Sequence, residues 1–167
     1  MTVLKKELEQ QPHQQVMILS HTKQMIHDLY KRIEPFESSI GYYLGGMKEE
    51  HLKESESKKI ILGTYAMASE GLDIKTLTTL FLVTPKSDVC QSVGRILRSK
   101  DHKPLVVDFL DEASVFESQF QKRKKYYQSK HYLIDEYENF RCYLENEPIL
   151  KIKKASPKSK KECLVSL

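Results

Sequence analysis

Residues 91–98 place two arginines and a glutamine at a spacing that suits a phosphate site. At about 100° per residue, Gln91, Arg95 and Arg98 fall on one face of a helix, and the aliphatic side chains fall on the other. A guanidinium group stays charged at any working pH and matches phosphate oxygens with its fork of N–H donors. Gly94 costs about 1 kcal/mol relative to alanine inside a helix, so a close approach by a ligand or backbone would explain it. This segment predicts either an anion clamp or an ordinary solvated charged face.

A glycine and a carboxylate lie on a predicted bend upstream of this helix. Asp73, 22 residues before Arg95, can accept hydrogen bonds from ribose hydroxyls while the arginines meet phosphates. Gly71 and Asp73 are weak evidence when taken alone, because glycine and aspartate are frequent in turns. Combined with the arginine-bearing helix, they indicate a nucleotide site.

The elements that must position these residues alternate between short apolar runs and amphipathic stretches. Continuous apolar runs of this length are typical of buried parallel strands, and helices between them favour right-handed crossovers. Thr22 is expected to cap the first of these helices, and Pro35 to end it. We therefore expect an α/β domain with an open, mainly parallel sheet of five or six strands and helices on both faces. The expected strands are residues 16–19, 40–44, 59–64, 79–83 and 105–109.

Ligands of open parallel sheets bind outside the carboxyl ends of the strands. In this chain, hydroxyl, imidazole and glycine residues follow several of the expected strands, and the arginine-bearing helix begins at the same edge. Hydroxyls and backbone amides there can bind phosphates without reading sequence. The residues at this edge are Ser20, His21, Thr22, Gly45, Gly46, Thr64, Tyr65, Thr84, Pro85 and Lys86.

Four segments are expected along the chain. Residues 1–13 are a lead-in or linker, residues 14–111 the sheet domain, residues 112–147 a helical extension and residues 148–167 a basic flexible tail. The extension is expected to hold two helices, with Val115, Phe116, Phe120 and Tyr127 in one apolar stripe and Ile134, Tyr137, Phe140 and Leu144 in the other. Residues 121–127 combine basic and aromatic side chains, as single-stranded nucleic-acid sites do, but a charged helix face beside buried rings is the favoured interpretation.

Charge and composition exclude several other classes of site. The 167 residues carry a formal net charge of +4, but residues 148–167 hold six lysines and one glutamate, which leaves the rest at −1. Overall basicity is therefore no argument for nucleic-acid binding by the folded part. Cysteines without CxxC spacing and histidines without ligand spacing predict no disulfide and no metal site, and they favour a reducing intracellular compartment, either cytoplasmic or nuclear. Neither a membrane span nor a signal peptide is expected.

Three segments resemble sequence motifs of superfamily 2 helicases. Residues 63–74, Gly-Thr-Tyr-Ala-Met-Ala-Ser-Glu-Gly-Leu-Asp-Ile, resemble motif V, and residues 91–98, Gln-Ser-Val-Gly-Arg-Ile-Leu-Arg, resemble motif VI. Residues 16–22 resemble motif IV, so the resemblance runs from about residue 14 to residue 110. It implies the second RecA-like domain of the motor. The sequences of these motifs are more similar to those of DNA-directed helicases and translocases, including those of large DNA viruses, than to those of the DEAD-box RNA group.

The resemblance also implies a role for each matching residue. Arg95 and Arg98 match the arginines that reach the ATP γ-phosphate across the domain cleft, one of them as an arginine finger, and Gln91 would help to order that contact. Gly71 and Asp73 match positions near the nucleotide. Thr64 matches a position that contacts the nucleic-acid backbone, for which Ser20, His21, Thr22 and Gly46 are further candidates.

The chain has neither a Gly-x-x-x-x-Gly-Lys-Ser/Thr phosphate loop nor an Asp-Glu-x-His or Asp-Glu-Ala-Asp run for magnesium. In this superfamily those parts belong to the first RecA-like domain. We therefore expect half of a motor, which uses ATP with Mg²⁺ only together with an N-terminal RecA-like domain and is inactive alone. Its partner is nucleic acid, with DNA favoured over RNA. The alternative is a non-catalytic RecA-like module that binds nucleic acid or a protein partner.

Overall fold

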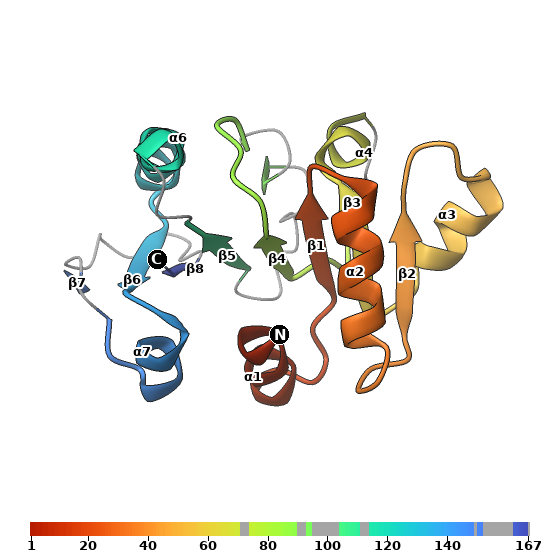
Figure 1. Ribbon diagram of the computed structural model, residues 1–167, viewed down its shortest axis with the longest axis horizontal. Helices are drawn as coiled ribbons and strands as arrows, with labels where there is room; N and C mark the ends of the chain where they lie inside the picture. Colours follow the sequence, from red (N-terminus) through yellow and green to blue (C-terminus); the bar gives the residue numbers. More distant parts are fainter. Residues whose placement is uncertain are drawn as a thin grey trace.

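The computed structural model describes residues 1–70, 74–89, 93–94, 104–110, 114–148, 150–151 and 162–166. Its strands form one sheet in the order β2-β3-β1-β4-β5-β8-β6-β7 (Figure 1). Every pairing is parallel except that of β6 with β7. The strands are β1 (Val16–Ser20), β2 (Ile40–Tyr43), β3 (Ile60–Thr64), β4 (Thr79–Leu82), β5 (Leu105–Phe109), β6 (Leu133–Tyr137), β7 (Leu150–Lys151) and β8 (Glu162–Ser166).

The predicted strands form the first half of this sheet. β1 lies between β3 and β4, with Val16 opposite Ile60 on one side and Thr79 on the other. All five residues of β1 and all five of β3 are buried, which explains why their sequences are continuous apolar runs rather than alternating ones. The α/β class and the five predicted strands are confirmed, and β6, β7 and β8 extend the sheet beyond them.

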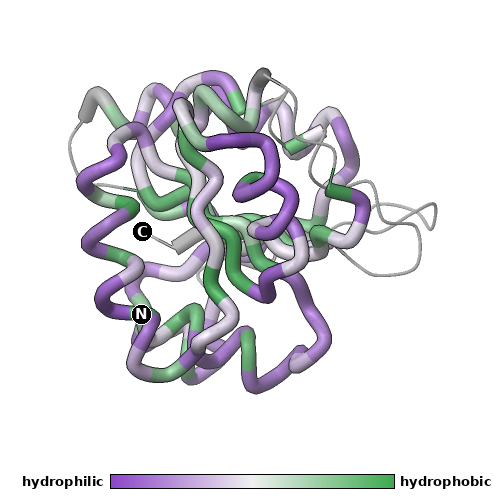
Figure 2. Tube along the Cα trace, turned by 90° about the vertical axis from the view of Figure 1, so that its right-hand side faces the viewer, coloured by the Kyte–Doolittle hydropathy of each residue, from purple (hydrophilic) through white to green (hydrophobic). Residues whose placement is uncertain are grey.

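Helices cover both faces of the sheet, as expected (Figure 1). One buried apolar cluster draws on α1, α2 and α7, and the other on α4 and α6. In Figure 2 the central strands are largely hydrophobic, whereas hydrophilic and hydrophobic residues alternate along the helices. The helices are α1 (Thr2–Gln10), α2 (Lys23–Ile33), α3 (Glu49–Glu56), α4 (Tyr65–Glu70), α6 (Ser114–Ser129) and α7 (Phe140–Glu145).

The start of α2 follows the prediction from sequence. Thr22 has an extended backbone, and its side chain accepts a hydrogen bond from the Met25 amide at 3.2 Å. This bond satisfies one of the amides that the first turn leaves without a helical partner. The helix ends at Ile33, before Pro35, although Glu34 keeps a helical backbone and its amide still donates to the Tyr30 carbonyl. Pro35 has no amide hydrogen with which to continue the helix.

The second predicted helix of the extension is wrong in its first half. Ile134 and Tyr137 lie on β6, which pairs with β8, and only Phe140 and Leu144 lie on α7. The side chain of Asn139 accepts hydrogen bonds from the amides of Arg141 and Cys142, so the helix begins at Phe140. The four apolar residues at helical spacing therefore belong to two elements, a strand and a helix, rather than to one helix.

The two end segments also differ from their predictions. Residues 162–166, placed in a flexible tail, form β8 between β5 and β6, and the short apolar run from Cys163 to Val165 suits a strand. Most of the predicted lead-in is helix α1, and Val3 and Leu4 are 5% and 3% exposed. Both side chains pack into the cluster that includes β1 and α2, because they share one face of the helix. Among the described residues, no helix is both long and apolar enough to span a membrane.

Candidate functional site

The carboxyl ends of β1 and β3 lie side by side. Ser20 and Thr64, the last residues of the two strands, are register partners, and their exposed fractions are 0% and 8%. Ser20 accepts a 3.4 Å hydrogen bond from the Thr22 amide, whereas Thr22 itself is exposed. The parallel register thus brings Ser20, Thr22 and Thr64, three of the residues predicted to contact a nucleic-acid backbone, to one edge of the sheet. Ser20 supports that edge from within, and Thr22 reaches solvent.

His21 attaches this edge to the loop of residues 84–86, which follows β4. The His21 amide donates to Thr84 Oγ1 at 3.0 Å, and ring atom Nε2 lies 2.6 Å from the carbonyl oxygen of Pro85. A carbonyl oxygen only accepts, so Nε2 carries the proton and donates. His21 is exposed, but it is held by two hydrogen bonds.

Tyr65, which begins α4, holds the same loop from a second side. Its hydroxyl donates to the carbonyl oxygen of Thr84 at 2.7 Å. Its ring centroid lies 4.8 Å from that of His21 and 4.8 Å from the ammonium nitrogen of Lys86. Burial, aided by the negative charge of Asp108, raises the pKa of Tyr65 above its ordinary value. Tyr65 therefore remains a protonated donor at any physiological pH.

A buried ion pair lies behind the loop. In the pair, Arg123 Nε lies 2.7 Å from Asp108 Oδ2, and Nη2 lies 2.9 Å from Oδ1. The Tyr127 hydroxyl donates to Asp108 Oδ2 at 3.0 Å, and Arg123 Nη1 donates to the carbonyl oxygen of Lys86 at 2.7 Å. Burial disfavours both charges, yet the hydrogen bonds and charge of Asp108 hold the pKa of Arg123 above its ordinary value. We call Asp108, Arg123 and Tyr127 the Asp108 network.

This network was not predicted from the sequence. The favoured interpretation of residues 121–127, a charged helix face beside buried rings, holds for Tyr127 but is wrong for Arg123, whose side chain is 1% exposed. A signal was present, since Asp108 is the single charged residue in the apolar run of residues 105–109. A buried carboxylate needs a partner, and the sequence does not say which of several basic residues provides it.

The loop after β2 carries the next candidate. Gly46 has a φ of 89°, a backbone conformation that side chains disfavour, and a Cβ built there meets open space. Lys23 of α2 donates to the carbonyl oxygen of Gly45 at 2.7 Å, which ties this loop to the helix that begins after β1. Gly46 is thus near the same edge, on a loop of its own.

The structure describes Gly94, but not the residues that flank it on the arginine face. A Cβ on Gly94 would lie 3.7 Å from the Tyr126 hydroxyl, an ordinary contact, so none of the described residues requires a glycine at this position. Val89 and Val93 are 1% and 0% exposed, and the Val93 amide donates to the Val89 carbonyl at 2.8 Å. Their burial agrees with the predicted apolar face. Gly71, Asp73, Gln91, Arg95 and Arg98 lie outside the described residues.

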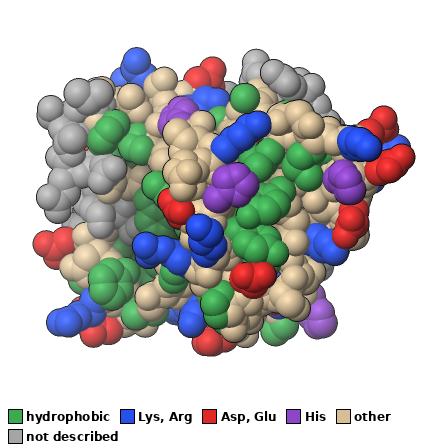
Figure 3. Space-filling model, turned by 45° about the vertical axis from the view of Figure 1, so that its right-hand side comes forward, with side chains coloured by type: hydrophobic (Ala, Val, Ile, Leu, Met, Phe, Trp, Pro, Cys, Tyr) green, Lys and Arg blue, Asp and Glu red, His purple; other side chains and the backbone are tan. Residues whose placement is uncertain are grey.

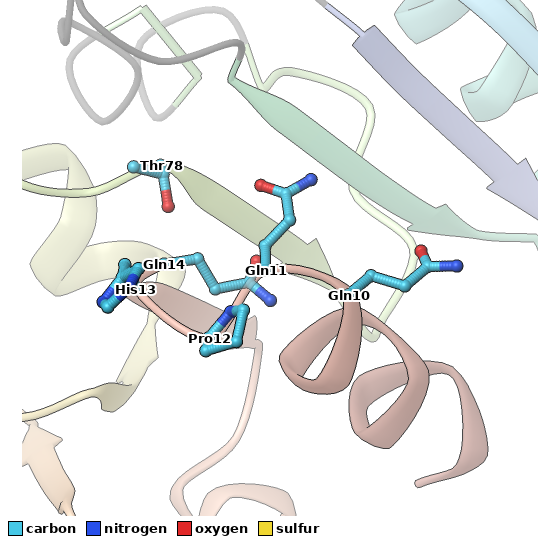
Figure 4. A pocket seen from close by; sticks show the side chains of 6 residues that line it. All are labelled: Gln10, Gln11, Pro12, His13, Gln14 and Thr78. Atoms are coloured by element: carbon cyan, nitrogen blue, oxygen red, sulfur yellow. The ribbon is translucent and has the colours of Figure 1, made fainter.

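A hollow of about 290 Å³ lies at the opposite, amino edge of the sheet (Figure 4). It is lined by Gln10, Gln11, Pro12, His13, Gln14 and Thr78. The Gln14 side chain already donates to the Glu7 carbonyl and accepts from Thr79 Oγ1. Because its polar groups serve the junction between α1 and the sheet, this hollow is separate from the strand-end site.

Charges of both signs are interspersed on the face that brings β2 and α3 forward (Figure 3). Hydrophobic side chains also gather on this face, beside histidine and lysine or arginine. On α2 and β2, the rings of Tyr30 and Tyr42 stack with centroids 4.8 Å apart, and His27 meets Tyr42 edge-on at 5.2 Å. The mixture agrees with the net charge of −1 that the sequence gives residues 1–147.

Fold and strand-end geometry together define a RecA-like α/β domain. Residues 1–100 match the family described as helicase conserved C-terminal domain. The chain belongs to this family. The elements that lie beyond the matched residues are β5, α6, β6, α7, β7 and β8.

The relatives with curated sequences agree with this assignment. "Putative ATP-dependent RNA helicase L396" of Acanthamoeba polyphaga mimivirus is 44% identical over 116 residues, which cover 68% of this chain and 22% of the relative. "Putative ATP-dependent RNA helicase QP509L" of African swine fever virus (isolate Pig/Kenya/KEN-50/1950) is 30% identical over 123 residues, 71% of this chain and 23% of the relative. The chain thus spans about a fifth of these viral proteins.

Among solved structures, the C-terminal domain of the DEAD-box protein Dbp5 superposes with a TM-score of 0.61. The match covers 74% of this chain and 76% of that domain at 17% sequence identity. Identity this low supports the shared fold alone.

Proposed function

We propose that this chain is the second motor domain of an ATP-dependent superfamily 2 helicase or translocase. One observation carries the proposal. The ends of β1 and β3 and the loop of residues 84–86 are hydrogen-bonded into a single edge. The segment that resembles motif V begins at the end of β3, and the segment that resembles motif VI follows the loop closely in the sequence. A strand-end edge with fixed polar groups suits a ligand with a phosphate backbone.

Nucleic acid would lie along this edge. The exposed Thr22 hydroxyl and the Lys86 ammonium are the groups best placed to meet phosphates, while His21 holds the loop of residues 84–86 in place. Ser20 and Thr64 end the two strands at this edge and are further candidates for the contact. Hydroxyl and ammonium groups contact phosphates without regard to base sequence, which suits a motor that must move along any strand. Gly46, with its open surroundings, leaves room for a strand to approach its loop.

ATP would bind between this domain and an N-terminal RecA-like domain. Arg95 and Arg98 would approach the γ-phosphate, with Gln91 ordering the contact and with Gly71, Asp73 and Gly94 near the nucleotide. The superfamily resemblance assigns the acidic magnesium motif to the first RecA-like domain, so we assign the Mg²⁺ ligands to that domain. ATP that binds the closed cleft more tightly than the open one would drive closure, and hydrolysis would release it.

The nucleic acid that binds this edge is either RNA or DNA, and both are to be tested. The names of the two viral relatives specify RNA helicases, so they give no support to the preference for DNA drawn from motif wording. The 2′-hydroxyl distinguishes the two strands at a binding site. The proposed partner is therefore nucleic acid, and the ATPase assay below distinguishes RNA from DNA.

The test is ATP hydrolysis by the full-length protein, with the 167-residue chain in parallel, each with single-stranded RNA, single-stranded DNA or neither. The proposal predicts strand-stimulated turnover by the full-length protein and none by this chain alone. Strand binding without turnover by the full-length protein would instead establish a non-catalytic binding module. A lack of both would refute the proposed function.

A further inference from the structure

Three successive backbone carbonyls in the loop of residues 84–86 accept hydrogen bonds from three different parts of the fold. Thr84 accepts from the Tyr65 hydroxyl of α4, and Pro85 accepts from the ring of His21, which follows β1. Lys86 accepts from Arg123 Nη1 of α6. The first two donors belong to the strand-end site. The third comes from a helix outside the residues that match the family.

The guanidinium group of Arg123 suits this task because its shape is rigid. Two of its nitrogens hold both oxygens of Asp108 at 2.7 and 2.9 Å, which fixes the plane of the group. The third nitrogen then points at the Lys86 carbonyl, 2.7 Å away. A lysine could keep the charge pair, but its single ammonium cannot reproduce a planar fork with three directed contacts.

Stability alone is a weak reason for such an arrangement. Apolar side chains of similar volume are often as stabilising as a buried ion pair, or more so. The ion pair instead fixes the orientation of a side chain. Asp108 of β5 holds the guanidinium group of Arg123, and that group holds the Lys86 carbonyl of the loop. The side chains of both residues are 1% exposed, so water does not compete for these contacts.

We propose that Arg123 is a positioning residue for nucleic-acid binding. By holding the Lys86 carbonyl, Arg123 fixes the backbone of residues 84–86. This backbone also accepts hydrogen bonds from His21 and Tyr65, and it carries the Lys86 ammonium. This inference rests on the proposed function, since it assigns the use of that edge to nucleic acid. Its structural part, the placement of residues 84–86, can be measured whether or not the chain binds nucleic acid.

Two variants of the 167-residue chain remove the contact without altering net charge. Arg123→Lys keeps the charge pair, and the triple variant Asp108→Leu, Arg123→Met, Tyr127→Phe replaces the whole network by apolar groups. The matched control is Lys124→Met with Glu136→Leu, a neutral exchange of an ion pair that joins α6 to β6. Because charge is preserved in all three, non-specific attraction to phosphates stays the same.

Three measurements are made on each variant: the thermal unfolding midpoint, exchange of the His21 amide proton by NMR, and affinity for a fluorescein-labelled single-stranded RNA or DNA oligonucleotide. In the triple variant we expect an unfolding midpoint near that of the wild type, because the buried charges and the Tyr127 hydroxyl are removed together and only the half-buried Lys86 carbonyl loses its donor. We also expect faster exchange at His21 and about tenfold weaker binding, as for the loss of one charge-assisted hydrogen bond. Arg123→Lys should show the same changes at His21 and in affinity, and the control should show neither.

A triple variant that folds, protects the His21 amide and binds like the wild type would overturn the inference. An affinity that merely follows the unfolding midpoint across all variants would overturn it as well. If the wild-type chain binds neither strand, the binding part of the proposed function fails and the positioning role for nucleic acid falls with it. Exchange at His21 then still decides whether Arg123 positions the loop.

Discussion

The hydroxyl of Tyr65 should contribute measurably to stability through one hydrogen bond. Tyr65→Phe keeps the ring against His21 and Lys86 but leaves the Thr84 carbonyl without its donor at 2.7 Å. A net hydrogen bond contributes about 1 kcal/mol, and an unsatisfied carbonyl adds to the loss, though half-buried Thr84 is open to some water. We therefore expect the free energy of unfolding to fall by about 1–2 kcal/mol.

The assay is urea unfolding followed by circular dichroism at pH 7, with thermal unfolding as a second measurement. For a domain of this size the expected loss corresponds to a midpoint lower by about 2–8 °C. Tyr30→Phe is the control, because that ring stacks on Tyr42 and its hydroxyl has no hydrogen-bond partner among the described residues. Equal unfolding free energies for Tyr65→Phe and the wild type would refute the claim that Tyr65 holds the loop after β4.

Two further predictions concern the edge strand β2 and its surroundings. The Ser39 amide donates to Glu37 and lowers the pKa of that carboxyl, so its stabilising effect is complete above the unfolded pKa and is lost as pH falls through the lower folded value. Glu37→Gln should flatten the decline of the unfolding free energy between about pH 5 and pH 3, by less than about 1 kcal/mol, and an unchanged pH profile would contradict this. Gly41→Ala would bring a Cβ within 2.8 Å of Ser55 Cα and should cost about 1–3 kcal/mol in urea unfolding. Gly45→Ala, whose Cβ makes only an ordinary 3.7 Å contact, is the control, and equal stability of the two would refute the packing argument.

The sequence was sufficient for the features that depend on neighbouring residues. Runs such as residues 60–62 are apolar throughout because both faces of their strands are covered, and Thr22 caps α2 through a bond to a residue three positions away. The strand-end edge followed from the same pattern, because the carboxyl ends of parallel strands meet at one side of the sheet.

Features that depend on distant partners could not be predicted in this way. The spacing of Ile134 and Tyr137 fits a helix as well as a strand, and the pairing with β8 decides for the strand. β8 itself follows a lysine-rich stretch whose composition favours solvent. The pairing of Asp108 with Arg123 depends on how α6 packs on β5, which no local pattern encodes.

The predicted nucleotide residues remain the part of the account that rests on sequence alone. Gly71, Asp73, Gln91, Arg95 and Arg98 lie outside the described residues, while the buried Val89 and Val93 support the apolar face of their helix. We infer that the apolar face with Val89 and Val93 anchors a helix, and that the arginines of this helix act on ATP held by another domain.

That claim is tested most directly by strand-stimulated ATP hydrolysis of the full-length protein carrying Arg98→Ala. The control is Arg141→Ala, which removes an equal charge from an exposed position on α7. We expect Arg98→Ala to lower stimulated turnover at least about a thousandfold, as for loss of an arginine finger, while strand affinity stays close to that of the control. Turnover at the wild-type rate in Arg98→Ala would contradict it.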